Sequence, residues 1–332
     1  MNLSAITPAI LAQHGLSAGY LALHESAAWF DVSDRGRIRV SGEDRARLLH
    51  AMSSNHIQGL EPGQGCYAFF LNAQGRILAD ANILCFADHL LLETEPELRA
   101  TIHEHLDRYI IADDVALEDR SSDIQAVAIA GPQAADVLLK LGAPVPQQQF
   151  SHLVWEASEA GERVVVNLTD SVVGGFLVLV PAIEKTLLIA ELAGAHIPQA
   201  TAEDARVVRL EAGRPRYGDE ITDRYLVQET GQMQAVHFTK GCYLGQEIVE
   251  RVRSRGQVHR KLKSVLIETD QPVAKGSAIT GVDGAAAGES IEAVYSPGYA
   301  KTVGMAYLRG PLAEDGAELR VDGMVARVAT VG

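Results

Sequence analysis

Apolar and polar positions along the chain predict two similar strand–turn–helix segments. Residues 37–52 (RIRVSGEDRARLLHAM) and 126–141 (AVAIAGPQAADVLLKL) align without gaps at an offset of 89. In each segment an apolar or alternating strand leads through a glycine, Gly42 or Gly131, into a short helix. Pro132 suits the first position of the second helix. We therefore expect two related α+β units, although strand–glycine–helix segments are common enough for coincidence to be the alternative.

A hairpin and a helix are predicted between these two segments. Residues 66–94 contain apolar runs on both sides of an Asn-Ala-Gln-Gly turn at 72–75. A polar turn between apolar runs is typical of a β-hairpin. Residues 97–110 repeat an apolar side chain at every fourth position, which favours a helix with one buried face.

The pattern changes near residue 256. Residues 258–332 hold short apolar runs separated by glycine turns, and an Asp-Gly pair at 322–323 lies between two alternating runs. This pair is a strong hairpin signal, so we expect a small all-β barrel or sandwich. The chain is therefore divided into a first α+β unit (1–120), a second α+β unit (121–255) and a C-terminal β-barrel (256–332).

Composition and charge narrow the functional classes. The chain has 332 residues with 47% hydrophobic and 22% charged residues, which is ordinary for a globular protein. The formal net charge of −14 argues against a globally basic nucleic-acid binder. The longest apolar run is broken by Gly and Pro and is too short to cross a membrane. Three widely spaced cysteines and the absence of Lys or Arg before Arg35 favour a cytoplasmic location without a targeting segment.

The segment FTKGCYLGQE, residues 238–247, is a candidate for chemistry. It places Lys240, Cys242 and Glu247 close together between glycines. A neighbouring cation or a helix N-terminus favours the thiolate that makes a cysteine reactive. The alternative is a buried thiol in a turn, because free cysteine is among the most buried residue types. The residues that follow, 246–255, fit either a helix or an alternating strand.

A basic run lies directly after this segment. Residues 251–263 hold six of the 29 Lys and Arg residues of the chain. They could bind an anion such as a carboxylate tail or a phosphate backbone. The alternative is a solvated surface, and we do not expect direct nucleic-acid binding because the chain is acidic and lacks clustered aromatic residues.

The motif KGCYLGQE at 240–247 resembles the signature of the YgfZ family of folate-binding proteins, whose relatives assist iron–sulphur cluster assembly. Residues 30–80 are similar to the opening of that family and of its relative, the glycine-cleavage T-protein. Residues 209–221 (RLEAGRPRYGDEI) and 294–309 are similar to further shared segments. The resemblance therefore extends over nearly the whole chain.

The resemblance implies a fold, a cofactor and partners. The fold is α+β with a GcvT-like three-domain arrangement, in which two related units and a terminal β-barrel surround a central channel. The cofactor is tetrahydrofolate or a derivative, bound in the channel. The implied function is to support assembly or repair of iron–sulphur enzymes, including tRNA-modifying ones, as an accessory factor without a defined turnover. Partners would be folate and iron–sulphur proteins or assembly factors.

The resemblance also points to particular site residues, and no metal ligands are among them. Lys240, Cys242 and Glu247 belong to the family motif and take the catalytic roles, while Tyr243 and Gln246 are expected to shape the loop. A carboxylate for the pterin ring and a cation for the glutamate tail would come from elsewhere in the chain. The expected folate contacts are Asp80, Asn72, Arg76, Arg209, Glu211, Tyr243, Gln246 and Arg251.

Two departures from the T-protein pattern affect the choice of function. The T-protein carries an Asp-Asp pair where this chain has Ala79-Asp80, and its folate-binding Glu is missing from the counterpart segment at 171–176 (SVVGGF). We therefore place T-protein chemistry second. The alternative function is a folate-dependent aminomethyltransferase of the glycine-cleavage T-protein type.

Overall fold

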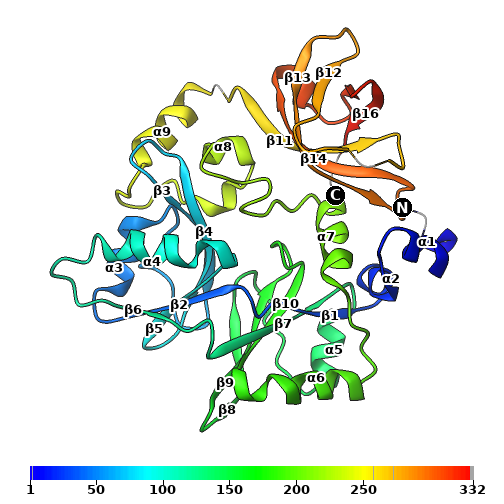
Figure 1. The fold of residues 1–332 in the computed structure, drawn as a ribbon. Helices are drawn as coiled ribbons and strands as arrows, with labels where there is room; N and C mark the ends of the chain where they lie inside the picture. Colours follow the sequence, from blue (N-terminus) through cyan, green and yellow to red (C-terminus); the bar gives the residue numbers. More distant parts are fainter. Residues whose placement is uncertain (2, 257, 272, 330–332) are drawn as a thin grey trace.

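Two five-stranded antiparallel sheets and a closed six-stranded barrel form the protein, seen in a computed structural model that describes residues 1, 3–256, 258–271 and 273–329 (Figure 1). The first sheet has the strand order β3-β4-β5-β2-β6. Its strands are β2 (Gly36–Ser41), β3 (Gly65–Leu71), β4 (Ile77–Cys85), β5 (His89–Thr94) and β6 (Ala116–Asp119).

The second sheet repeats the arrangement of the first. Its strands are β1 (Ala28–Asp31), β7 (Ile124–Ala130), β8 (His152–Ser158), β9 (Gly161–Leu168) and β10 (Gly175–Pro181). The order β8-β9-β10-β7-β1 matches the order β3-β4-β5-β2-β6 place by place, which confirms the two related α+β units. The edge strands are exchanged: β1 precedes β2 in the chain but pairs with β7, and β6 precedes β7 but pairs with β2. The second sheet therefore combines β1, from before residue 120, with four strands that follow it, whereas all strands of the first sheet lie before residue 120.

The two glycines aligned in the sequence have the same structural role. Gly42 follows β2 with φ +99° and Gly131 follows β7 with φ +114°, a region that favours glycine. A Cβ atom at Gly42 would lie 2.0 Å from the carbonyl oxygen of Asp114, and one at Gly131 would lie 2.7 Å from that of Ser26. Glycine is thus required where each strand turns into its helix.

Helices cover one face of each sheet. The α-helices are α1 (Pro8–Gln13), α2 (Ala18–Glu25), α3 (Arg45–Met52), α4 (Arg99–Asp107), α5 (Ala134–Lys140), α6 (Lys185–Gly194), α7 (Ala202–Glu211), α8 (Val227–Thr230) and α9 (Gln246–Arg255). Apolar side chains of α3 and α4 pack into the core of the first sheet, and those of α5 and α6 pack into the core of the second. Leu84 and Leu91 of the first sheet join a third core with Ala126 and Ala128 of the second, so the two sheets also contact each other.

The C-terminal barrel confirms the β-rich tail. Its strands are β11 (Arg260–Ile267), β12 (Ala278–Gly281), β13 (Ala286–Ser296), β14 (Lys301–Arg309), β15 (Glu318–Val321) and β16 (Met324–Val328). Asp322 and Gly323 connect β15 to β16 with φ +48° and +83°. Positive φ at both central residues is the geometry of the two-residue hairpin turn that Asp-Gly favours.

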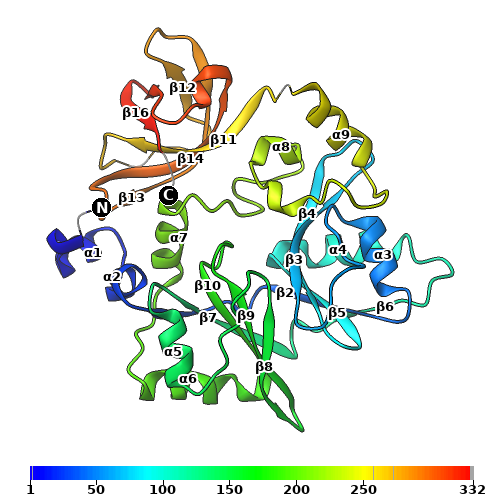
Figure 2. The same ribbon diagram turned by 180° about the vertical axis from the view of Figure 1, so that it is seen from behind.

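The chain between the second sheet and the barrel returns to the first sheet. Helix α7 lies between the second sheet and the barrel, whereas α8 and α9 lie beside the hairpin of β3 and β4 in both views (Figures 1 and 2). Tyr243 and Val249 share a core with Phe69, Leu71 and Ile77 of that hairpin. The loop at 238–245, called the motif loop below, is therefore packed against the first sheet.

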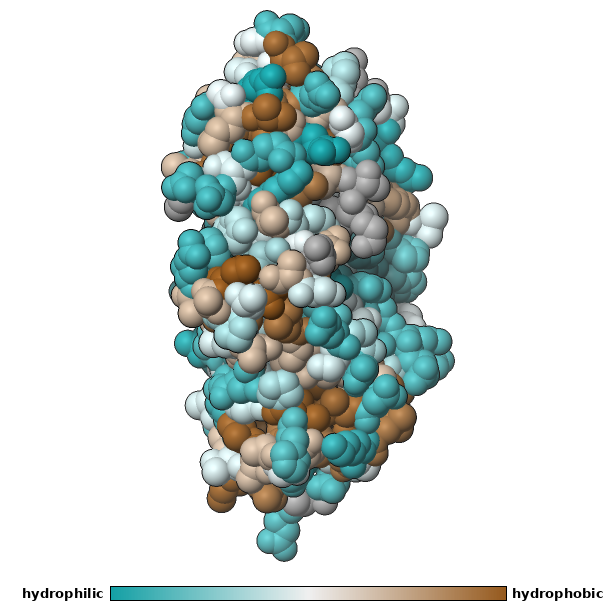
Figure 3. Space-filling view, turned by 90° about the vertical axis from the view of Figure 1, so that its right-hand side faces the viewer, coloured by the Kyte–Doolittle hydropathy of each residue, from teal (hydrophilic) through white to brown (hydrophobic). Residues whose placement is uncertain are grey.

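The surface on the side of α1 and α2 mixes hydrophilic and hydrophobic residues (Figure 3). Exposed apolar side chains include Leu139, Ile183 and Leu187, close to or within α5 and α6. Among the described residues, no helix combines the length and apolar composition that a membrane span requires.

Candidate functional site

Two neighbouring cavities lie between the three parts of the fold. The first, called the Asp80 cavity, has a volume of about 240 Å³ and lies between the first sheet and the segment 213–217. The second, called the α7–barrel cavity, has a volume of about 430 Å³ and is bounded by the second sheet, α7 and strands β11 and β14. Asp170, Val172 and Arg214 line both, so the cavities adjoin at these residues.

Asp80 is one of several titratable groups that line the smaller cavity. It lies in β4, where alternate side chains point to opposite faces, so Asp80 and Asn82 face the cavity together. Burial raises the pKa of Asp80 to about 7, against the effect of the Tyr67 hydroxyl, which donates a hydrogen bond of 2.6 Å to Oδ2. Within the described residues, Oδ1 accepts no hydrogen bond. Asp80 can therefore exchange a proton near neutral pH.

A row of polar side chains crosses the first sheet beside Asp80. Asn82 stands opposite Tyr67 on one side and Glu93 on the other. The amide Nδ2 of Asn82 donates to Oε2 of Glu93 at 2.7 Å. Because a carboxylate paired with Arg35 only accepts, this bond fixes the orientation of the amide. Oδ1 of Asn82 is then buried without a hydrogen-bond partner among the described residues.

The cations around the Asp80 cavity are mostly neutralised by carboxylates. Arg35 contacts Glu93 and Glu95, and both bonds are charge-assisted. Arg216 lies 2.8 Å from Glu95 and 2.9 Å from Glu97. This network anchors the cavity wall.

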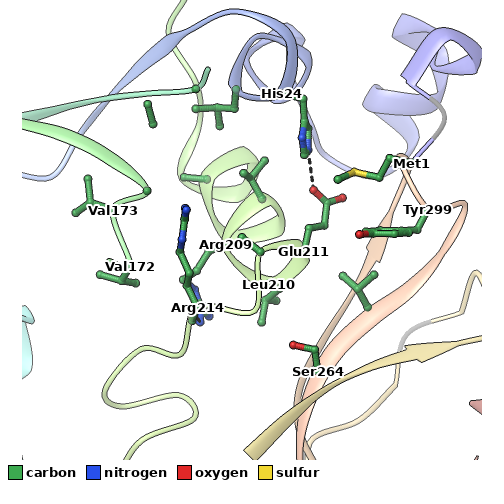
Figure 4. A pocket seen from close by; sticks show the side chains of 18 of the residues that line it. Met1, His24, Val172, Val173, Arg209, Leu210, Glu211, Arg214, Ser264 and Tyr299 are labelled. Atoms are coloured by element: carbon green, nitrogen blue, oxygen red, sulfur yellow. Dashed lines mark hydrogen bonds and ion pairs between the residues drawn. The ribbon is translucent and has the colours of Figure 1, made fainter. Parts of the chain in front are cut away.

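Glu211, predicted as a folate contact, lines the α7–barrel cavity and holds three parts of the chain together. Its carboxylate accepts from the Tyr20 hydroxyl at 2.7 Å, lies 2.7 Å from His24 Nε2, and accepts a short bond from the Ser296 hydroxyl. Figure 4 shows the His24–Glu211 contact at the wall of the α7–barrel cavity, with Met1 on the same side. The partners come from α2 and β13, so Glu211 links both to the end of α7.

The two arginines of the α7–barrel cavity differ in their partners. Arg209 donates to Glu220 at 2.8 Å and to the carbonyl oxygen of Arg214 at 2.8 Å, so its guanidinium is paired. Arg214 is half-buried, and its guanidinium makes no ion pair or hydrogen bond with the described residues. Burial lowers the pKa of Arg214, and the charge of Asp170 partly offsets this effect.

Lys240 anchors the motif loop. Its ammonium donates to the carbonyl oxygens of His50, Ser53 at 2.6 Å and Asn55 at 2.9 Å, at the end of α3. An ammonium has three donors, and these bonds use all of them. Burial lowers the pKa of Lys240 to about 8. The geometry gives Lys240 a positioning role.

The other motif residues surround an exposed thiol. Cys242 is exposed on the loop, while Tyr243 is buried beneath the Lys240 ammonium, which lies 4.7 Å from the ring centroid. Oε1 of Gln246 accepts from the Tyr243 backbone at 3.3 Å.

Glu247 is exposed and forms a 2.9 Å ion pair with Arg251 one helical turn later. Residues 246–255 form α9, which settles the choice between helix and strand.

Asn72 and Arg76 shape the hairpin turn that contacts the motif loop. Oδ1 of Asn72 accepts from the backbone of Gln74 and Arg76 at 3.0 Å. Arg76 donates to the carbonyl oxygen of Arg224 at 2.6 Å. A Cβ atom at Gly245 would lie 2.6 Å from the carbonyl oxygen of Asn72, so turn and loop meet closely.

The predicted site residues thus divide into three places: Asp80 in its cavity, Arg209 and Glu211 at the α7–barrel cavity, and the remaining eight on or beside the motif loop and its hairpin. Much of the basic run is paired with carboxylates. Arg253 lies 3.5 Å from Glu250, and Lys263 lies 2.7 Å from Asp315.

Three histidines lie beside the motif loop and were not predicted from the sequence as site residues. The rings of His50 and His56 have centroids 4.9 Å apart, and those of His56 and His237 are 5.0 Å apart. A side chain at Gly241 would begin 3.7 Å from His50 Nε2. Burial, and then the charge of Lys240, lowers the pKa of His50 to about 4. Among the described residues, no group of three or more His, Cys, Asp or Glu side chains is arranged to hold a metal ion.

Tyr67, Asn82 and Arg214 were also missed as cavity residues. Alternation along β4 from Asp80 could have identified Asn82, because positions two apart share a face. Tyr67 required the register of the β3–β4 hairpin. Arg214 could not be identified from neighbouring residues, because it lies 134 positions after Asp80 in the sequence.

Known proteins resemble this chain in sequence and in fold. A chloroplastic protein of Arabidopsis thaliana that carries the name of a transferase is 30% identical over 262 residues, which is 78% of this chain and 60% of that protein. An aminomethyltransferase of Rubrobacter xylanophilus is 26% identical over 309 residues, covering 92% of this chain and 82% of the relative. The chain thus spans only about three fifths of the chloroplastic relative.

A solved structure shares the whole architecture. The aminomethyltransferase T of the glycine cleavage system from Bartonella henselae superposes with a TM-score of 0.84 at 21% identity, over 95% of this chain and 88% of that one. This likeness confirms the expected GcvT-like fold. The sequence profile described as the GCVT N-terminal domain matches residues 9–240. Because this match covers more than half of the chain, the protein belongs to the family of the GCVT N-terminal domain.

Proposed function

We propose that this protein binds tetrahydrofolate, with the pterin ring in the Asp80 cavity, and acts as a folate-dependent transferase of the aminomethyltransferase type. The observation that supports this most is a buried carboxyl group, Asp80, whose pKa is raised to about 7 within a cavity. The relatives named as transferases support the reaction class. The single carboxylate at Asp80, without a second at Ala79, is a difference from the pattern expected of the T-protein.

The residues of the cavity fit a pterin ring. The ring needs a flat slot with acceptors for its N–H donors. Such acceptors are Oδ1 of Asp80 and Oδ1 of Asn82, which has no hydrogen-bond partner in the described part of the chain, and Phe150 and Val172 form an apolar wall. A volume of about 240 Å³ lies below the usual range for a drug-sized ligand, roughly 300–1,000 Å³, so the cavity accommodates a ring rather than a whole folate.

Asp80 and Tyr67 supply the acid–base chemistry of this site. Tetrahydrofolate, when bound, supplies the nitrogen atoms that carry a one-carbon unit. Tyr67 holds Oδ2 of Asp80, which leaves Oδ1 to accept or release a proton toward the cavity. The paired charges of Arg35 with Glu93 and Glu95 form the neighbouring wall of the same cavity.

Calorimetry and a transfer assay test the proposal. Tetrahydrofolate is titrated into the wild type, Asp80→Asn and the control Asp107→Asn, which changes an exposed carboxylate at the end of α4. The same variants are assayed with an aminomethyl-lipoyl carrier protein. We expect binding and transfer in the wild type and the control, and at least about a tenfold loss of both in Asp80→Asn. Absence of tetrahydrofolate binding in the wild type would contradict the proposal.

The exposed Cys242 favours a second function. A thiol presented on a loop that Lys240 anchors suits an accessory factor of the YgfZ type, which supports assembly or repair of iron–sulphur enzymes, including tRNA-modifying ones. One thiol gives too few ligands to hold a cluster alone, so iron–sulphur proteins or assembly factors would complete the site. In this case tetrahydrofolate is bound, but the transfer assay shows no turnover.

Complementation separates the two functions. Cells that lack the protein receive the wild type, Cys242→Ser or Asp80→Asn, and activities of iron–sulphur enzymes are measured. The accessory function predicts that Cys242→Ser fails to restore these activities although it binds tetrahydrofolate normally. Full restoration by Cys242→Ser would exclude a role of this thiol.

A further inference from the structure

The side chain of Arg214 lies where the two cavities meet. It makes no ion pair or hydrogen bond with the described residues, although it is half-buried. Nη1 of Arg214 packs so closely on Gly174 that a Cβ atom there would lie 2.3 Å away. The contact with a glycine that has φ +71° places the guanidinium against the loop between the cavities.

The backbone of Arg214 is held in place. Its carbonyl oxygen accepts from Arg209, whose guanidinium is fixed in turn by Glu220 at 2.8 Å. Asp170 is the carboxylate whose charge acts on Arg214, yet it forms no ion pair with it within the described residues. The Arg214 guanidinium is partly buried in the cavity wall and has no partner among the described residues. A guanidinium in this situation can bind a carboxylate through two parallel hydrogen bonds.

The α7–barrel cavity provides the space for the rest of such a ligand. Its volume of about 430 Å³ falls within the usual range for small-molecule sites. Apolar side chains line it from three directions: Phe30 from the second sheet, Val208 from α7 and Val303 from the barrel. In Figure 4, Arg214 lies on one side of the cavity, with Ser264 and Tyr299 across from it.

Two other charged side chains at this cavity, Glu211 and Arg209, have hydrogen-bond partners of their own. Glu211 is occupied by Tyr20, His24 and Ser296, as described above. Arg209 is occupied by Glu220. Of the two arginines that line this cavity, Arg214 is therefore the one available to recognise an anion, and the apolar walls favour an amphipathic one.

We propose that the α7–barrel cavity is a binding site for an amphipathic carboxylate, with the carboxylate on Arg214 and the apolar body between α7 and the barrel. Two sources offer this chemistry. One is a separate small molecule beside the folate; the other is the aminobenzoyl-glutamate tail of a folate whose ring occupies the Asp80 cavity. The second source rests on the proposed function, and the first does not.

A matched pair of probes tests the site itself. We would titrate 4-phenylbutyrate and its neutral amide, 4-phenylbutanamide, into the wild type, Arg214→Gln, Ser264→Phe and the control Arg108→Gln, an exposed residue next to α4. Ser264 lines the α7–barrel cavity but not the Asp80 cavity, so Ser264→Phe fills only the former. Thermal unfolding of each variant verifies that it is folded.

The expected pattern is specific. The wild type and Arg108→Gln bind the carboxylate at least about tenfold more tightly than the amide, Arg214→Gln loses this preference, and Ser264→Phe binds neither probe. Equal affinity for the two probes in the wild type, no measurable binding of either, or undiminished binding in a folded Ser264→Phe would overturn the proposal.

Two further titrations distinguish the source. If the ligand is the folate tail, Arg214→Gln and Ser264→Phe weaken tetrahydrofolate but not 6-methyltetrahydropterin, which lacks the tail, and tetrahydrofolate displaces 4-phenylbutyrate. If the ligand is separate, 4-phenylbutyrate binds undiminished at saturating tetrahydrofolate. If neither tetrahydrofolate nor 6-methyltetrahydropterin binds, but 4-phenylbutyrate and its amide bind as expected, the proposed function is wrong and the carboxylate site is supported.

Discussion

The hydroxyl group of Tyr67 donates a 2.6 Å hydrogen bond to Oδ2 of Asp80, across adjacent strands of the first sheet. The bond favours the ionised carboxylate, whereas burial disfavours it more strongly, and the result is a pKa raised to about 7. We expect this pair to link stability with the ligand binding and acid–base chemistry of the proposed function.

Asp80→Asn should stabilise the protein at alkaline pH. The pKa of Asp80 is raised from 3.8 to about 7 in the folded protein, so the unfolded chain releases the proton first and the folded state loses stability as pH rises between these values. Asn keeps an acceptor for Tyr67 without the charge. We expect the variant to gain about 2–4 kcal/mol in the free energy of unfolding at pH 8, and little near pH 4, measured by urea denaturation. Asp107→Asn serves as the control, and an equal gain at both pH values would contradict this assignment.

Tyr67→Phe should shift the titration of Asp80 to higher pH. The Tyr67 hydrogen bond lowers the pKa of Asp80, so its removal leaves burial less opposed. The pKa of Asp80 should rise above about 7, seen in the carboxyl carbon resonance by NMR and in the midpoint of pH-dependent tetrahydrofolate binding. An unchanged or lower midpoint would show that the hydroxyl does not act on Asp80.

Lys240→Met should loosen the motif loop. The substitution retains the apolar stem but removes donors to the carbonyl oxygens of Ser53, Asn55 and His50, which stay buried. Leaving these acceptors without a partner should cost about 2–4 kcal/mol of unfolding free energy and speed amide hydrogen exchange at residues 241–245. The exposed Lys275→Met is the matched control, and equal exchange rates in both variants would argue against the anchor.

Alkylation should distinguish Cys242 from the other two thiols. Cys242 is exposed, whereas burial raises the pKa of Cys66 to about 12 and also raises the pKa of Cys85. Iodoacetamide should therefore modify the native protein at Cys242 alone, as mass spectrometry of peptides can show, and Cys242→Ser should remain unmodified. Labelling of Cys66 or Cys85 in the folded protein would contradict the burial seen here.

Features that depend on neighbouring residues could be predicted from the sequence. The Asp322-Gly323 turn needs positive φ at two adjacent positions, and few residue pairs allow it. The glycines at 42 and 131 mark the same strand-to-helix turn in both units, so the internal repeat was visible. The exchange of β1 and β6 between the sheets was not, because strand pairing depends on contacts between distant segments.

The site was predictable only in part, for the same reason. Asp80 was found through a resemblance, but its raised pKa comes from burial by segments far along the chain, such as residues 213–217. The motif at 240–247 suggested chemistry for Lys240, yet the carbonyl groups that bind its ammonium lie about 190 positions earlier. Arg214 became visible only where the two cavities meet.

Our proposal that Asp80 holds the pterin ring of a folate can be tested by calorimetric titration with tetrahydrofolate between about pH 5.5 and about pH 8.5. We predict that wild-type affinity rises as Asp80 ionises near pH 7, and that Asp80→Asn binds at least about tenfold more weakly above that pH, without this transition. Equal affinity of the two proteins across the whole range would contradict the claim.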